Sequence, residues 1–310
     1  MNLAFTFPGQ GSQSVGMMAA YGDHTVIRAT FEEAGDVLGT DLWALVDVGP
    51  AEQLNLTTNT QPAMLAAGVA VYRLWRELGG PQPQVMAGHS LGEYTALTCA
   101  GALDFADALR LVRTRAEAMQ AAVPEGQGGM AAILGLDDAV VEELCRQAAQ
   151  GQVVAAVNFN CPGQVVIAGE RPAVERAMAL AKAHGAKRAL MLPVSVPSHC
   201  ALMQPAAEAL RQALAAVEIR SPRVPVLHNV DVAAHAAPEA IRTALTQQLY
   251  SPVRWVETVL AMRDMGVALV AECGPGKVLA GLNKRILGDV ATPALADAAS
   301  LAETLARVNN

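Results

Sequence analysis

Apolar residues fall along this chain in two patterns, short continuous runs and longer segments with a helical period. The short runs are typical of buried strands and lie at 3–7, 85–87, 224–228 and 268–272. The longer segments predict helices at 60–78, 104–123, 201–217, 238–248, 253–265, 277–286 and 295–308. Strands that alternate with helices favour a mostly parallel sheet covered by helices on both faces.

The pattern changes after the glycine-rich segment at 126–129. Strands are then expected at 130–134, 153–158, 164–168 and 187–192. Helices are expected between them, at 137–150 and 172–184. This strand–helix–strand–strand–helix–strand order, within about 65 residues, is that of a ferredoxin-like domain. We therefore predict an α/β fold, with an α/β-hydrolase-like large domain at 1–126 and 196–310 and an inserted ferredoxin-like small domain at 127–195.

A G-x-S-x-G motif, centred on Ser90, lies between the strand at 85–87 and a helix-forming run at 93–97. This context is typical of a nucleophile elbow, in which a tight turn exposes the serine hydroxyl at the edge of a sheet. Gly88 and Gly92 leave room for the strained backbone of such a turn. The motif also occurs by chance, but its flanking elements favour acyl transfer through a covalent acyl-serine.

A serine hydroxyl needs a general base, which is usually histidine. Of the six histidines in the chain, His199 lies where the small domain ends and the large one resumes, and clefts are common at domain junctions. His228 follows a predicted strand and is the second candidate. The alternative for either residue is a histidine that is hydrogen-bonded inside the core.

Arg115 falls within the apolar stripe of the helix at 104–123. A cation on a buried face is costly unless an anion meets it. One explanation is a carboxylate elsewhere in the protein. The other is the carboxylate of a substrate, held by the planar fork of the guanidinium. A malonyl group, which carries a free carboxylate, would suit the second explanation.

Composition narrows the class of protein and its location. The net charge of −7 and the 4% aromatic content argue against a nucleic-acid partner. The five cysteines form no C-x-x-C pair, so we expect free thiols in a reducing compartment and no metal site. The first residues carry no basic group, and no apolar run reaches the ~18 residues of a membrane helix, so we expect a cytoplasmic protein without signal peptide or membrane contact.

Five segments together resemble one family, the malonyl-CoA:acyl carrier protein transacylases of type II fatty acid synthesis. The segments are FPGQGSQ at 7–13, GHSLGEY at 88–94, VPSH at 196–199, QLYSPV at 248–253 and ECGPG at 272–276. They occur in the order of the family. The resemblance implies that Ser90 accepts the acyl group, that His199 is its base and that Arg115 binds the malonyl carboxylate.

The resemblance also implies roles for backbone groups and for partners. The N–H groups of Gln10 and Leu91 would form the oxyanion hole, and the carbonyl of Gln248 would orient the base. Malonyl-CoA and acyl carrier protein would be the substrates of a ping-pong reaction that supplies fatty acid elongation, with no cofactor. The chain would act as a monomer. Two basic pairs would dock the acidic carrier protein, namely Lys187 with Arg188 and Lys284 with Arg285.

Three alternatives stay open from the sequence. A stand-alone polyketide acyltransferase would look similar. A serine thioesterase or esterase would need an acid that orients the base, and the usual order puts it between Ser90 and His199. The candidates for that acid are Asp104, Asp107, Asp137 and Asp138. A carrier-protein-binding module with an inactive site is the third alternative.

Overall fold

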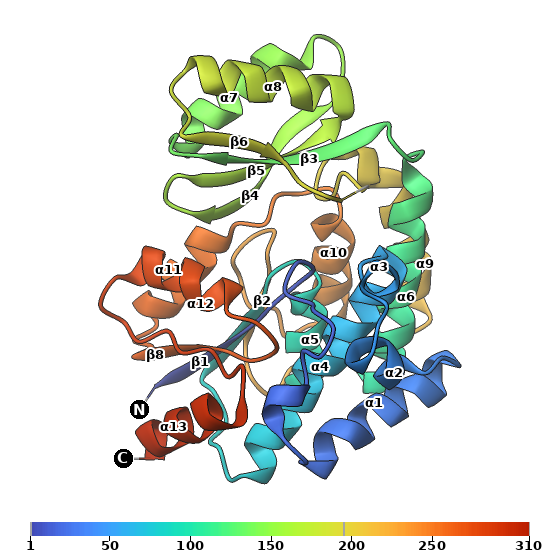
Figure 1. Ribbon diagram of the computed structural model, residues 1–310, viewed down its shortest axis with the longest axis vertical. Coiled ribbons are helices and arrows are strands. Elements are labelled where there is room, and N and C mark those ends of the chain that lie inside the picture. Colours follow the sequence, from blue (N-terminus) through green and yellow to red (C-terminus); the bar gives the residue numbers. More distant parts are fainter. Residues whose placement is uncertain (1, 195, 310) are drawn as a thin grey trace.

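Two β-sheets of different kinds organise the protein, as seen in the computed structural model, which describes residues 2–194 and 196–309 (Figure 1). The first is a parallel sheet with the strand order β7-β2-β1-β8. Its strands are β1 (Leu3–Phe7), β2 (Val85–Gly88), β7 (Val226–Leu227) and β8 (Leu269–Glu272). Every residue of β1 is buried, as expected for a parallel strand covered on both faces.

Helices cover both faces of the parallel sheet, in agreement with the predicted alternation. The helices of this part of the fold are α4 (Thr57–Glu77), α5 (Gly92–Cys99), α6 (Phe105–Ala122), α9 (Gln204–Ala215), α10 (Pro238–Gln248), α11 (Trp255–Asp264), α12 (Val278–Leu287) and α13 (Ala298–Asn309), of which α9 packs on α6 and α10 packs on α9. Asp104 caps α6, because its side chain accepts a hydrogen bond from the Ala106 N–H at 2.9 Å. Phe5 of β1 packs edge-on against Trp75 of α4, with 5.3 Å between the ring centroids.

Three helices near the N-terminus were not predicted: α1 (Thr25–Leu38), α2 (Leu42–Asp47) and α3 (Ala51–Leu54). The helix α1 has a periodic signal, because Ile27, Phe31, Ala34 and Leu38 form its buried face. The other two are too short for a hydrophobic period to be recognisable. The strand expected at 224–228 contains only the two residues of β7.

The second sheet is antiparallel, with the strand order β4-β5-β3-β6. Its strands are β3 (Gly128–Leu134), β4 (Val154–Cys161), β5 (Gln164–Glu170) and β6 (Arg188–Met191). Two helices, α7 (Asp138–Ala149) and α8 (Arg171–Ala183), pack on one face (Figure 1). The order of elements and the pairing of the strands are those of the predicted ferredoxin-like fold. The predicted limits of the small domain, at 127 and 195, stay a prediction.

A short stretch of backbone pairing joins the small sheet to the segment that follows α10. The N–H of Phe159 in β4 donates to the Val253 carbonyl at 3.1 Å, and the Val253 N–H donates to the Val157 carbonyl at 2.8 Å. Val253 and Val157 are both fully buried. The small sheet is therefore fixed beside the segment that follows α10. No helix within the described residues is long and apolar enough to span a bilayer.

Candidate active site

Ser90 occupies the turn between β2 and α5, as the motif predicts. Its backbone is in the left-handed region, with a φ of 52°. The neighbouring glycines make this turn possible. A Cβ on Gly88 would lie 1.8 Å from the Gly92 carbonyl carbon, and a Cβ on Gly92 would lie 2.0 Å from the Phe7 carbonyl oxygen. The turn therefore requires glycine at both positions.

His199 lies beside the serine. The Ser90 Oγ and the His199 Nε2 are 2.8 Å apart, and the His199 Nδ1 is 2.7 Å from the carbonyl oxygen of Gln248. A carbonyl can only accept, so Nδ1 carries the proton and Nε2 is free to accept the serine proton. The backbone at His199 is also left-handed, with a φ of 65°. The predicted base and its predicted carbonyl partner are thus brought together with Ser90.

The environment keeps the imidazole neutral. His199 is 3% exposed, and its burial, followed by the nearby cation of Arg115, lowers the pKa of His199 to about 3. The hydrogen bond to the Gln248 carbonyl acts in the opposite direction and is outweighed. At neutral pH this side chain is therefore in the form that accepts a proton.

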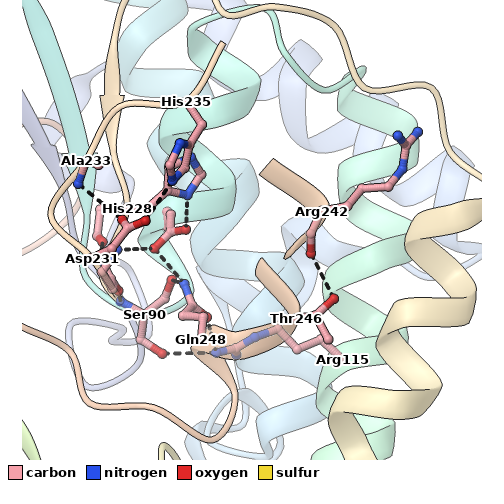
Figure 2. A network of polar contacts seen from close by, with 12 residues as sticks. Ser90, Arg115, His228, Asp231, Ala233, His235, Arg242, Thr246 and Gln248 are labelled. Atoms are coloured by element: carbon pink, nitrogen blue, oxygen red, sulfur yellow. Dashed lines mark hydrogen bonds and ion pairs between the residues drawn. The ribbon is translucent and has the colours of Figure 1, made fainter. Parts of the chain in front are cut away.

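Arg115 of α6 points at the same serine (Figure 2). Its Nη2 donates to the Ser90 Oγ at 3.1 Å and to the Gln248 Oε1 at 3.0 Å, and its Nη1 donates to the Gln61 Oε1 at 2.9 Å. The side chain is 1% exposed. Within the described residues no carboxylate forms an ion pair with it. Neutral amides hold the guanidinium instead, so the internal ion pair, one of the two explanations from the sequence, is absent from this part of the chain.

A cavity of about 130 Å³ opens beside these three side chains, between the two sheets. The predicted oxyanion donors, Gln10 and Leu91, both line it. No acceptor in the described part of the chain contacts the backbone N–H of either residue. Other residues that line the cavity are Gln61, His89, Met119, Met130, Asn158, Leu192, Val194, Val196 and Ser198.

The second candidate base lies elsewhere. His228 is fully buried, and its Nδ1 is 2.7 Å from a carboxylate oxygen of Glu93, so it is a hydrogen-bonded core histidine. The four acids considered for a hydrolase triad make no hydrogen bond to His199 in the described part of the chain. Asp104 caps α6, and Asp107 pairs with Arg110 at 3.1 Å. Asp137 and Asp138 lie at the start of α7, the helix that packs on the small antiparallel sheet.

The four basic residues predicted to dock a carrier protein are all exposed. Two of them lie at the same end of the small sheet. In the antiparallel sheet, Leu134 of β3 lies between Arg188 of β6 and Gln164 of β5. The side chain of Gln164 in turn accepts a hydrogen bond from the Arg285 Nη1 at 2.7 Å. The N–H of Lys187 donates to the Leu134 carbonyl at 2.8 Å, and Lys284 precedes Arg285 in α12.

Three polar residues at the site were not found from the sequence: Gln61, Glu93 and Asn229. The Ser90 N–H donates to the Asn229 Oδ1 at 2.8 Å, and the Asn229 Nδ2 donates to the Gly88 carbonyl at 2.7 Å. The position of Asn229 just after β7 was a sequence signal that could have predicted its place at the site. The carboxyl ends of neighbouring parallel strands share one edge of the sheet, so Asn229 and the elbow after β2 had to lie close together.

Comparison with known proteins places this chain in a family. Residues 4–301 match the acyl transferase domain family, and the chain belongs to it. It is 58% identical over 303 residues to the malonyl CoA-acyl carrier protein transacylase of Escherichia coli K12, a match that covers 97% of this chain and 98% of that protein.

Solved structures agree with this assignment. The malonyl CoA-acyl carrier protein transacylase of Coxiella burnetii superimposes with a TM-score of 0.99 at 51% identity, covering 100% of this chain and 98% of that one. A malonyl-transacylase in complex with its type II PKS acyl-carrier protein superimposes with a TM-score of 0.98 at 56% identity, covering both chains fully.

Proposed function

We propose that this protein transfers the malonyl group of malonyl-CoA to the phosphopantetheine thiol of an acyl carrier protein. The observation that carries the proposal is the buried guanidinium of Arg115, which touches the Ser90 Oγ and pairs with no carboxylate in the described residues. A buried cation that is held by neutral groups is suited to receive a carboxylate from outside. A malonyl ester on Ser90 would bring that carboxylate with it.

In the first half-reaction His199 Nε2 takes the proton of Ser90 while Oγ attacks the thioester carbonyl. The oxyanion of the tetrahedral intermediate is stabilised by the N–H groups of Gln10 and Leu91, each contributing roughly 3–4 kcal/mol. Collapse breaks the C–S bond, and the CoA sulfur leaves with the proton from His199. General-base assistance of this kind accelerates such a step by about 10²–10⁴-fold.

The second half-reaction reverses these roles. The carrier's thiol gives its proton to His199 and attacks the malonyl ester, and Ser90 recovers the proton as its C–O bond breaks. The Gln248 carbonyl holds the imidazole in one tautomer throughout. The reaction uses only these protein groups and two substrates, so no cofactor is required. All five cysteines are free, which supports a reducing compartment, the cytoplasm, as its location.

The basic residues Lys187, Arg188, Lys284 and Arg285 are proposed to receive the acidic carrier protein. Their exposure and the position of Arg188 and Arg285 at one end of the small sheet support this role. Attraction between exposed charges speeds the encounter of two proteins and is screened by salt.

Incubation with malonyl-CoA followed by intact-mass measurement tests the proposal. We expect a malonyl adduct that is absent in Ser90→Ala and is passed on to a carrier protein bearing phosphopantetheine. His199→Ala should stay folded, by circular dichroism, and form the adduct at least about 10²-fold more slowly. Rapid release of malonate without an acceptor thiol would identify a hydrolase instead, and absence of adduct and turnover would identify an inactive binding module.

A second candidate function concerns the carrier rather than the chemistry. The relative solved with a type II PKS acyl-carrier protein is 56% identical to this chain, so a polyketide carrier is the alternative acceptor. Competition between a fatty acid and a polyketide carrier protein for the same malonyl-enzyme separates the two. The preferred acceptor is the one with the higher kcat/KM.

A further inference from the structure

Glu93 is a buried carboxylate next to the active site to which the proposed mechanism assigns no role. It lies in the first turn of α5 and is 0% exposed. Its two oxygens accept three hydrogen bonds. Oε1 is 2.7 Å from the His228 Nδ1, and Oε2 accepts from the Asn229 N–H and from the Gln248 Nε2, both at 2.9 Å.

The contact with Gln248 determines which way that side-chain amide faces. An ionised carboxylate can only accept, so the NH₂ group of Gln248 must face Glu93. The same NH₂ group donates to the Ser90 carbonyl at 2.9 Å. The amide oxygen is thereby left facing Arg115, whose Nη2 it accepts at 3.0 Å. The backbone carbonyl of this one glutamine meanwhile holds His199.

A second connection runs from Glu93 to the nucleophile. The backbone N–H of Asn229 is fixed by the carboxylate, and the side chain of Asn229 bonds to the Gly88 carbonyl and the Ser90 N–H, on either side of His89 in the first half of the turn. The turn at Ser90 is in the left-handed region and is therefore strained. These two bonds hold the backbone that leads into Ser90 and so help to keep its hydroxyl aimed at the cavity.

Glu93 also compensates the charge of Arg115 without touching it. The amide of Gln248 stands between the carboxylate and the guanidinium. The negative charge of Glu93 acts on Arg115 across this amide and favours its charged form. A direct ion pair would occupy the face of the guanidinium that a substrate carboxylate needs. The inserted amide puts a neutral contact there instead, which a substrate carboxylate can displace without breaking an ion pair.

We propose that Glu93 is a positioning residue. Acting through Asn229 and Gln248, it fixes the relative positions of the nucleophile, the base and the substrate-binding arginine. The part of the proposal that concerns malonyl binding rests on the proposed function. The part that concerns the Ser90–His199 pair does not, because it applies to any acyl group.

The variant Glu93→Gln tests the proposal. The amide matches the carboxylate in shape but turns an NH₂ group toward donors that need an acceptor. We expect kcat to fall for both malonyl-CoA and acetyl-CoA, and KM to rise for malonyl-CoA alone. The combined loss in kcat/KM for malonyl-CoA should be about 10- to 150-fold.

The matched control is Glu272→Gln. Glu272 is also a fully buried glutamate, at the end of β8, and accepts from the Ala280 N–H at 2.7 Å away from the cavity residues. This control should retain the kinetics of the unchanged protein. An equal loss in both variants, or unchanged kinetics in folded Glu93→Gln, would overturn the proposal.

A spectroscopic readout separates positioning from activity. Long-range ¹H–¹⁵N correlation of the histidine rings, assigned with His199→Gln, reports which ring nitrogen of His199 carries the proton. We expect the Nδ1–H tautomer in the unchanged protein and a mixture of tautomers in Glu93→Gln. An unchanged tautomer would contradict the proposal. This readout still decides the role of Glu93 if the unchanged protein fails to transfer malonyl, an outcome that would refute the proposed function.

A second variant covers the case in which Glu93→Gln does not fold. Gln248→Met keeps the backbone carbonyl for His199 and removes the amide between Glu93 and Arg115. We expect a raised KM for malonyl-CoA, with an acetyl-CoA KM that is unchanged. The absence of any change in the malonyl-CoA KM would overturn the proposed connection from Glu93 to Arg115.

Discussion

The Nη2 of Arg115 donates a hydrogen bond to the Oγ of Ser90 at 3.1 Å, so a buried cation touches the atom on which an acyl group would be carried. Its other hydrogen bonds go to two glutamine amides, and the guanidinium also lies over the ring of Tyr94. A carboxylate on the acyl group can therefore replace neutral contacts without breaking an ion pair. This relationship distinguishes the site from that of an esterase for neutral substrates, which has no use for a cation at this place.

The first prediction concerns the variant Arg115→Ala. Loss of a charge-assisted pair worth about 1.5–3 kcal/mol should lower kcat/KM for malonyl-CoA by ~10- to 150-fold. Use of acetyl-CoA, which has no carboxylate, should hold or improve. Steady-state kinetics with the two thioesters measure the difference, and equal losses for both would refute the carboxylate-binding role.

The pH dependence of acylation follows from the lowered pKa of His199, about 3 in the fold against 6.5 for an ordinary histidine. The imidazole stays neutral as the pH falls through 6.5, so the acylation rate with acetyl-CoA should persist to about pH 5. Stopped-flow acylation rates on protein shown to be folded give the measurement. A rate that halves near the ordinary value of 6.5 would contradict the assignment.

The same shift affects stability in a defined direction. Below pH 6.5 the unfolded chain binds a proton at His199 that the folded chain does not, so stability falls as the pH is lowered from 6.5 toward 3. Urea unfolding should show this loss, and His199→Gln should reduce it. A variant whose acid sensitivity equals that of the unchanged protein would disprove the contribution.

The next prediction concerns glycine at the elbow. Gly92→Ala would place a methyl group 2.0 Å from the Phe7 carbonyl oxygen, and the required shift should cost about 1–3 kcal/mol or more and abolish acylation. Gly281→Ala is the control, because a Cβ there meets nothing within 4 Å on the exposed face of α12. That change should stabilise the helix by about 0.5–1 kcal/mol. Similar unfolding midpoints for the two variants would argue against the steric account.

Docking of the carrier protein can be tested by charge reversal. Arg188→Glu should raise KM for the carrier and weaken its salt dependence, while KM for malonyl-CoA stays unchanged. Arg307→Glu is a control, because Arg307 is an exposed residue of α13, at the opposite end of the molecule from the small sheet (Figure 1). Equal effects at the two positions would show that net charge, rather than a docking site, controls the encounter.

Much of the site followed from local patterns. The elbow could be predicted because its motif consists of a few consecutive residues. The burial of Arg115 followed from the helical period of its apolar neighbours. Glu93 and Asn229 escaped, because their importance depends on contacts between segments more than one hundred residues apart. The side chain of Gln248 escaped for another reason. Only its carbonyl was implied to act, and the orientation of its amide is decided by partners that the sequence does not place beside it.

The pairing of β4 with Val253 limits how the molecule can move. Val253 lies shortly after Gln248, and its hydrogen bonds to Val157 and Phe159 would have to break before the small sheet could swing away. The small sheet is thus connected to the large domain close to Gln248, whose carbonyl accepts the hydrogen bond of His199. The cavity that contains Ser90 and His199 is lined by residues from both sides of this connection, so its shape depends on these two backbone hydrogen bonds staying intact.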